Sequence, residues 1–123
     1  MLRKVAYAAA VLALVASPAL AAGDAGKGEK VFKKCKACHV ADAEKNRVGP
    51  HLVGIFGRTA GTAEKFKYSK AMTSAGKEGL VWTEETISEY LKAPKKFVKG
   101  TRMAFAGLKK QDDIDNVIAY LKA

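Results

Sequence analysis

The pentapeptide Cys35-Lys36-Ala37-Cys38-His39 constrains the fold more than any other feature of this chain. Its C-x-x-C-H spacing is typical of attachment sites for c-type haem. Two thiols three positions apart on a helical turn can each add to one vinyl group of the same porphyrin, and the adjacent imidazole can then bind the iron. A chain with this motif is expected to fold around one covalent haem c, held through Cys35 and Cys38.

Other uses of a C-x-x-C pair fit the rest of the sequence less well. A zinc site needs four ligands, and the sequence offers only one further histidine, His51, and no further cysteine. A thioredoxin-like redox pair is expected beside a βαβ pattern, and no period-two run indicates strands. A disulfide across so short a loop would stabilise the fold little.

The first 21 residues have the pattern of a secretory signal peptide. A basic start with Arg3 and Lys4 precedes an apolar run over residues 5–16, and Ala19-Leu20-Ala21 supplies the small residues that signal peptidase prefers. The apolar run is shorter than the roughly 20 residues that a transmembrane helix needs. We therefore expect cleavage after Ala21, export to the periplasm, and one mature domain over residues 22–123.

The mature chain is expected to be strongly basic. The sequence has 22 Lys and Arg against 12 Asp and Glu, so the loss of Arg3 and Lys4 leaves a formal charge of +8. Two haem propionates would lower this to about +6. The cations are spread along the chain, which argues against nucleic-acid binding. Many flank the haem-bearing segments and together predict a docking face for acidic partners: Lys33, Lys34, Lys36, Arg47, Lys95, Lys96, Lys99, Arg102, Lys109 and Lys110.

Two predicted helices begin at recognisable N-caps. Asp24 is a candidate N-cap for a helix that leads into the haem motif. Thr83, followed by two glutamates that suit the positive end of the helix dipole, is a candidate N-cap for a second helix. That helix is expected to stop at Ala93, because the residue before Pro94 disfavours helical backbone.

Two further helices complete an all-α fold with long loops. A short helix is predicted over residues 69–75, ended by Gly76. Apolar residues at positions 114, 117, 118 and 121 have helical spacing and predict a C-terminal helix, opened by Asp112 and Asp113. Long loops in so small a domain are unusual unless something fills the middle of the fold, and the haem would do so.

The occupant of the sixth iron position decides what such a haem can do. Met1 would leave with the signal peptide, and Met72 falls in the predicted short helix, where it is expected to pack in the core. Met103 lies in a loop that can wrap over the far face of the ring, so it is the favoured ligand. His51 is the rival, but it follows His39 by only twelve positions, and we expect it to face solvent or a propionate.

Taken together, these segments resemble the class I cytochromes c, in particular the mitochondrial-like periplasmic proteins of bacteria. The resemblance covers residues 23–123. The matching segments are Cys35 to His39, Gly49-Pro50-His51-Leu52, Gly54, Phe56-Gly57-Arg58, Tyr68-Ser69, Trp82 to Thr86, Tyr90-Leu91, Pro94-Lys95-Lys96, Gly100 to Met103, Phe105-Ala106-Gly107 and Ile118 to Leu121. The resemblance implies a small cytochrome c fold, with loops wrapped around one covalent haem.

The resemblance also implies roles for the site residues. His39 and Met103 would be the axial iron ligands. The carbonyl group of Pro50 would accept a hydrogen bond from the second ring nitrogen of His39, and Tyr90 would place its hydroxyl near the sulfur of Met103. Four side chains would hydrogen-bond or screen the buried haem propionates: Arg58, Tyr68, Trp82 and Thr101.

In the same way, the N- and C-terminal helices would cross, with Gly28 and Phe32 against Val117 and Tyr120. One departure from the family concerns the methionine loop. Lys99 stands where the family usually has proline before the Gly-Thr pair, so the fixed φ of proline is lost and the loop is expected to open more readily.

The function that the resemblance implies is that of a soluble periplasmic one-electron carrier, a monomer and not an enzyme, because two axial ligands leave no open iron position. The expected partners are a quinol-oxidising membrane complex as donor and a terminal oxidase or photosynthetic reaction centre as acceptor, with only peripheral membrane contact. Two alternatives remain. One is a haem peroxidase or gas-binding protein in which Met103 detaches, which Lys99 favours. The other is a dedicated electron donor to a periplasmic reductase.

Overall fold

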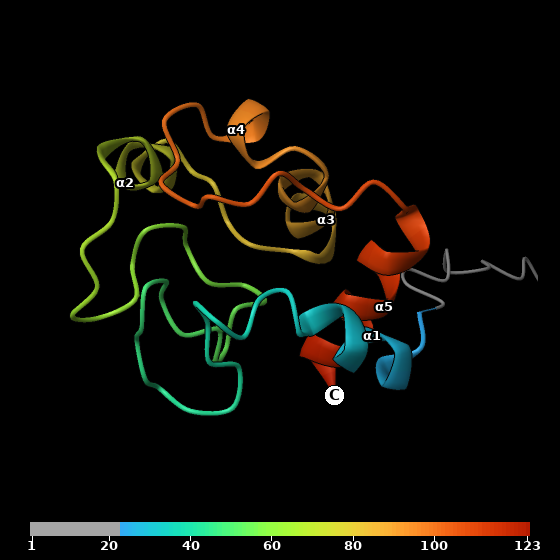
Figure 1. Ribbon diagram of the computed structural model, residues 1–123. Coiled ribbons are helices and arrows are strands. Elements are labelled where there is room, and N and C mark those ends of the chain that lie inside the picture. The colour runs from blue at the N-terminus through green and yellow to red at the C-terminus, as the bar shows by residue number, and fades with distance from the viewer. Residues whose placement is uncertain (1–22) are drawn as a thin grey trace, which may run out of the picture.

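The computed structural model describes residues 23–123. The predicted signal peptide and its cleavage after Ala21 lie outside these residues. The described chain forms helices joined by long loops, and within it only an isolated bridge between Thr59 and Val81 has strand-like pairing (Figure 1). The helices are α1 (Ala25–Phe32), α2 (Lys70–Lys77), α3 (Glu84–Lys92), α4 (Pro94–Phe97) and α5 (Gln111–Lys122). The predicted all-α class is confirmed.

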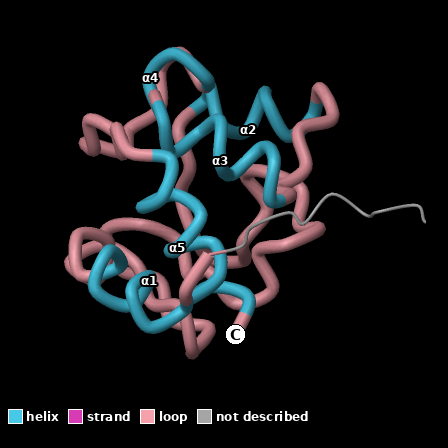
Figure 2. Tube along the Cα trace, turned by 90° about the vertical axis from the view of Figure 1, so that its right-hand side faces the viewer, coloured by secondary structure: helices cyan, strands magenta, loops and turns pink. Residues whose placement is uncertain are grey.

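Helices α1 and α5 lie side by side at one end of the molecule (Figures 1 and 2). The crossing is close because Gly28 has no side chain: a Cβ atom there would lie 1.9 Å from the carbonyl oxygen of Asn116. One turn later the rings of Phe32 and Tyr120 pack with centroids 5.1 Å apart. The backbone N–H of Asp24 also donates to the side chain of Asn116 at 2.8 Å. The predicted crossing of the terminal helices is thus present.

Both predicted N-caps are confirmed. The Asp24 carboxylate accepts from the backbone N–H of Lys27 at 3.0 Å and opens α1. The Thr83 hydroxyl accepts from the backbone N–H of Thr86 at 3.1 Å, and the Thr86 hydroxyl accepts from the backbone N–H of Thr83 at 2.7 Å. This reciprocal capping box satisfies donors that the first turn of α3 would otherwise leave without partners.

Replacing Thr83 with alanine is expected to lower the free energy of unfolding by about 1 kcal/mol, because one half of the capping box is lost. Denaturant unfolding of the haem-loaded protein, followed by far-ultraviolet circular dichroism, would measure the change. Thr83→Ser keeps the hydroxyl and serves as the control. Equal stability of the alanine and serine variants would contradict the role assigned to the cap.

The end predicted for the short helix is wrong. Gly76 lies inside α2, which continues to Lys77, and the chain turns at Gly79, whose φ is +104°. The N–H groups of Gly79 and Leu80 donate to the carbonyl groups of Gly76 and Ala75, at 3.1 and 3.0 Å. This is a Schellman motif. Gly76 is needed instead for packing, because a Cβ there would lie 1.9 Å from the carbonyl oxygen of Ala60.

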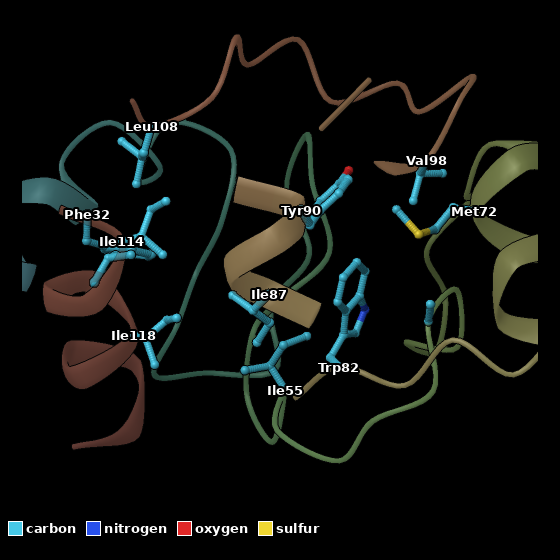
Figure 3. Close-up of a cluster of buried hydrophobic side chains, with 12 residues drawn as sticks. Phe32, Ile55, Met72, Trp82, Ile87, Tyr90, Val98, Leu108, Ile114 and Ile118 are labelled. Carbon is cyan, nitrogen blue, oxygen red and sulfur yellow. The ribbon is translucent and has the colours of Figure 1, made fainter. Parts of the chain in front are cut away.

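Helix α3 ends before Pro94 as predicted, but the chain then forms α4, a single turn that the sequence reasoning missed. Pro94 occupies the first turn of α4, where the missing N–H costs nothing. Buried side chains lie on both sides of α3 and form one cluster (Figure 3). None of the helices in residues 23–123 is long and apolar enough to cross a membrane.

Candidate haem site

A cavity of about 620 Å³ lies between the haem motif and the loop that carries Met103. Its wall is largely apolar, with side chains such as Leu52, Ile55 and Phe105. All ten side chains predicted for the site line it: Cys35, Cys38, His39, Pro50, Arg58, Tyr68, Trp82, Tyr90, Thr101 and Met103. Residues scattered over the sequence therefore meet around a single space.

The haem motif continues directly from α1. The N–H of Cys35 donates to the carbonyl of Phe32 at 2.8 Å, and the N–H of His39 donates to that of Cys35 at 2.9 Å. These bonds hold the motif in a helical turn. The two thiols and the imidazole accordingly belong to the same wall of the cavity.

The ring of His39 is held in one tautomer. Its Nδ1 lies 2.7 Å from the carbonyl oxygen of Pro50. Because a carbonyl oxygen can only accept, Nδ1 must carry the proton, and Nε2 keeps the lone pair that a metal ion requires. Burial lowers the pKa of His39, and this effect outweighs the opposing effect of the Pro50 hydrogen bond. The imidazole is therefore neutral and oriented.

Gly49 packs directly on the His39 ring, a contact for which the sequence reasoning assigned no role. A Cβ at Gly49 would lie 2.4 to 2.9 Å from three atoms of the imidazole. Its N–H also donates to the carbonyl of Cys38 at 2.8 Å. The Gly49 backbone against the ring and the hydrogen bond to the Pro50 carbonyl together restrict the orientation of the imidazole.

Elsewhere in the cavity lining, a hydrogen bond joins Tyr90 to the methionine loop. The Tyr90 hydroxyl lies 2.7 Å from the Thr101 hydroxyl. The Tyr90 ring packs on that of Trp82, with centroids 5.0 Å apart. Burial raises the pKa of Tyr90, so the phenol keeps its proton at neutral pH. The partner of the Tyr90 hydroxyl in this structure is Thr101, and this bond connects α3 to the segment that presents Met103.

The hydrogen bonds of Arg58 indicate a position where the cavity could bind an anion. Its guanidinium donates to the carbonyl groups of His51 and Val53, at 3.0 and 3.3 Å. Its Nε atom is buried and has no partner among the described residues. Burial lowers the pKa of Arg58, but arginine stays protonated in proteins. Arg58 lines the cavity, and a buried guanidinium with an N–H left unpartnered suits a carboxylate such as a haem propionate.

These features fit a covalent haem c. The cavity is wide and mostly apolar, as a porphyrin requires. The lining offers two thiols, an imidazole with a free Nε2 and the thioether of Met103, and Arg58 offers a donor without a partner among the described residues. Imidazole and thioether are both suitable donors for haem iron.

The two other residues considered as iron ligands, His51 and Met72, lie in different places. His51 is absent from the cavity wall, and its Nδ1 accepts from the backbone N–H of Val53 at 3.2 Å. Met72 is buried and does line the cavity. It lies in the core cluster with Tyr90 and Val98, and Figure 3 shows these side chains beside Trp82. Met72 is thus a packing residue, as predicted, but one that belongs to the haem pocket.

The mouth of the cavity is basic. Lys34, Arg47 and Arg102 line it as the sequence suggests, and Lys67 joins them. No aspartate or glutamate among the described residues lines this cavity. The other seven cations of the predicted set are exposed but are not part of the wall. Acidic side chains gather in a separate groove between α3 and α5: Glu84, Glu85, Glu89 and Asp115.

Comparison with known proteins identifies the family. The model of the family described as cytochrome c matches residues 25–123. The chain belongs to the cytochrome c family. In this family member, the two cysteines of the C-x-x-C-H motif mark the attachment of one covalent haem c.

The relatives of this cytochrome c include bacterial proteins. It is 57% identical to cytochrome c2 of Afifella marina over 77% of each chain. It is 46% identical to cytochrome c2 of Blastochloris viridis, over 98% of this chain and 93% of that protein. The solved structure of cytochrome cH from Methylobacterium extorquens matches with a TM-score of 0.74 and 44% identity, over 81% of this chain and 98% of that one. These similarities identify the chain as an electron carrier.

Proposed function

We propose that this protein is a soluble periplasmic one-electron carrier that moves electrons between a quinol-oxidising membrane complex and a terminal oxidase or photosynthetic reaction centre. The single observation that carries the proposal is that His39 and Met103 line one largely apolar cavity, in which both could bind the haem iron. With His39 and Met103 as its two ligands, the iron would have no place for a substrate. Haem c supplies the redox chemistry, by cycling between Fe(III) and Fe(II).

The protein side chains tune this chemistry and keep it reversible. His39 is held by Pro50 and Gly49, so the nitrogen ligand need not move when the charge of the iron changes. His/Met ligation in a largely apolar cavity favours the reduced state. Arg58 would bind a propionate, so that this carboxylate is not left buried without a partner.

The basic mouth of the cavity supports docking to acidic partner surfaces. The cavity that would hold the haem is lined by four exposed cations, Lys34, Arg47, Lys67 and Arg102. The acidic groove lies elsewhere, between α3 and α5. A partner with a negative docking surface would therefore attract one side of the carrier and repel another, which speeds productive encounters.

The methionine loop supports the carrier over an enzyme. Although Lys99 replaces the usual proline, the N–H of Thr101 still donates to the carbonyl of Val98 at 3.0 Å. Gly100, with a φ of +94°, supplies the positive φ that a type II turn needs at its third position. The turn before Met103 is therefore closed despite Lys99, and this closed turn supports the carrier over a peroxidase or a gas-binding protein.

The test is the ionic-strength dependence of electron transfer between the haem-loaded protein and purified membrane complexes. The second-order rate constant is expected to fall at least about tenfold from low to high salt, because salt screens the attraction between the basic mouth and the partner. Stopped-flow spectroscopy of the haem would follow it. A rate that is independent of salt with every quinol-oxidising complex, oxidase and reaction centre tried would refute docking through the basic mouth.

A further inference from the structure

The peptide group between Pro50 and His51 is hydrogen-bonded at both of its ends. Its carbonyl oxygen accepts from Nδ1 of His39 at 2.7 Å. Its N–H donates to Oδ1 of Asn46 at 3.0 Å. One peptide unit therefore connects the imidazole of the haem motif to the carboxamide of a residue that does not itself line the cavity.

The side chain of Asn46 is held in one orientation by its two partners. A backbone N–H can only donate, so the N–H of His51 faces the amide oxygen. A carbonyl can only accept, so the amide nitrogen faces the carbonyl of Glu64, to which it donates at 2.9 Å. This second bond spans 18 positions and ties the segment before Pro50 to the loop that contains Glu64. The two ends of the amide thus make two different contacts.

The neighbouring backbone holds the peptide group in place. On one side of it, the N–H of Gly49 donates to the carbonyl of Cys38 at 2.8 Å. On the other side, the N–H of Leu52 donates to the carbonyl of Val40 at 2.9 Å. The two acceptors flank His39 in the sequence, so both segments are fixed around the imidazole. Hydrogen bonds in such a series polarise one another.

We propose that Asn46 is a positioning residue for His39, because its amide oxygen polarises the Pro50–His51 peptide group and thereby raises the basicity of the imidazole. When Oδ1 draws on the N–H, the carbonyl oxygen of the same group becomes more negative and bonds the Nδ1 proton more strongly. The imidazole becomes a more basic ligand, which favours Fe(III) over Fe(II) and lowers the reduction potential. The inference rests on the proposed function, since it requires His39 to bind a redox-active iron.

Two substitutions separate the two ends of the amide. Asn46→Ala removes both hydrogen bonds. Asn46→Asp also loses the donor to Glu64, but its carboxylate is a stronger acceptor for the N–H of His51. Both variants should therefore be less stable than wild type to guanidinium. Their reduction potentials, in contrast, should move in opposite directions, upward for alanine and downward for aspartate.

The expected change in the equilibrium constant for reduction is about threefold in each direction, which is about 30 mV at about 59 mV per tenfold. Loss of a partner that bonds a metal ligand directly changes metal affinity about 10- to 100-fold, and Asn46 acts through one further group. Potentiometric titration of the haem-loaded variants would measure the potentials. Proton NMR of the reduced, diamagnetic protein would follow the Nδ1 proton of His39, which should move to higher field in Asn46→Ala and to lower field in Asn46→Asp.

Lys45→Gln is the matched control for charge. It lowers the net charge by one, as Asn46→Asp does, at the neighbouring and exposed position. The Lys45 side chain takes no part in the series of bonds from His39 to Asn46. Any change in its potential is therefore coulombic, and its His39 Nδ1 proton should keep the wild-type resonance.

Three outcomes would overturn the inference. Potentials that move in the same direction in both Asn46 variants, with an unchanged Nδ1 resonance, would make Asn46 only a bridge between loops. Equal lowering of the potential in Asn46→Asp and Lys45→Gln, again with an unchanged resonance, would leave charge as the sole cause. This second comparison decides alone if Asn46→Ala does not fold. Neither result involves a redox partner, so the proposed function would stand, whereas a wild type whose His39 ring protons show no shift from the haem would refute both proposals.

Discussion

Replacing Met103 with alanine is expected to lower the reduction potential by a few tenths of a volt and to open the iron to external ligands. The proposed axial thioether would be lost, and axial ligands set haem potentials over a range of about 0.8 V. The weak long-wavelength band from sulfur to ferric iron should vanish, and carbon monoxide should bind the reduced protein at neutral pH. Absorption spectroscopy and a potentiometric titration would measure these changes.

The second methionine of the cavity provides a matched control. Met72 is buried in the same wall, so Met72→Leu removes a thioether from the cavity without removing the proposed ligand. This variant should keep the long-wavelength band from sulfur to ferric iron and should not bind carbon monoxide. If instead Met72→Leu loses the band and Met103→Ala retains it, the ligand assignment is wrong. The pair of variants thus decides between the two methionines that the described cavity holds.

Gly28→Ala is expected to destabilise the fold by about 3 kcal/mol or more, which places it among the larger single-residue effects. The new Cβ would meet backbone, with the carbonyl oxygen of Asn116 only 1.9 Å away, so α1 and α5 would have to separate. The haem motif follows α1 directly, and its geometry should suffer as well. Guanidinium unfolding of the haem-loaded protein would give the loss in stability.

Gly26→Ala is the matched control for this change, because both glycines belong to α1. A Cβ at Gly26 would lie 3.2 Å from a carboxylate oxygen of Asp24, which is the end of a side chain and can move. Alanine is also the better helix former, so this variant should stay within about 1 kcal/mol of wild type. Equal losses at the two positions would attribute the effect to helix propensity and exclude the crossing as its cause.

Local signals in the sequence account for the features that were predicted correctly. Asp24 and Thr83 open their helices with side chains that bond to nearby N–H groups, and this chemistry depends on only a few neighbours. The pattern C-x-x-C-H likewise specifies its chemistry within five residues. Such features can be predicted because they do not depend on contacts with residues far away in the sequence.

The features that were missed depend on contacts between distant segments. Gly76 resembles a helix end in sequence, but the carbonyl of Ala60 requires its small size, and Gly79 ends α2. The contact of Gly49 with His39 is also tertiary, and no local pattern marks it. Lys67 also lines the basic mouth because the loops bring it there, and no local pattern in the sequence indicates this position. For these residues, packing overrides the local preference of the sequence.

The bond between Asp24 and Asn116 spans 92 positions. Contacts of such high sequence separation close large loops, and the entropy lost on closing them slows folding. The packing of α1 against α5 therefore cannot form until almost the whole polypeptide has been synthesised. Helix α1, from which the haem motif continues, therefore gains this packing partner only when the last helix of the chain is present.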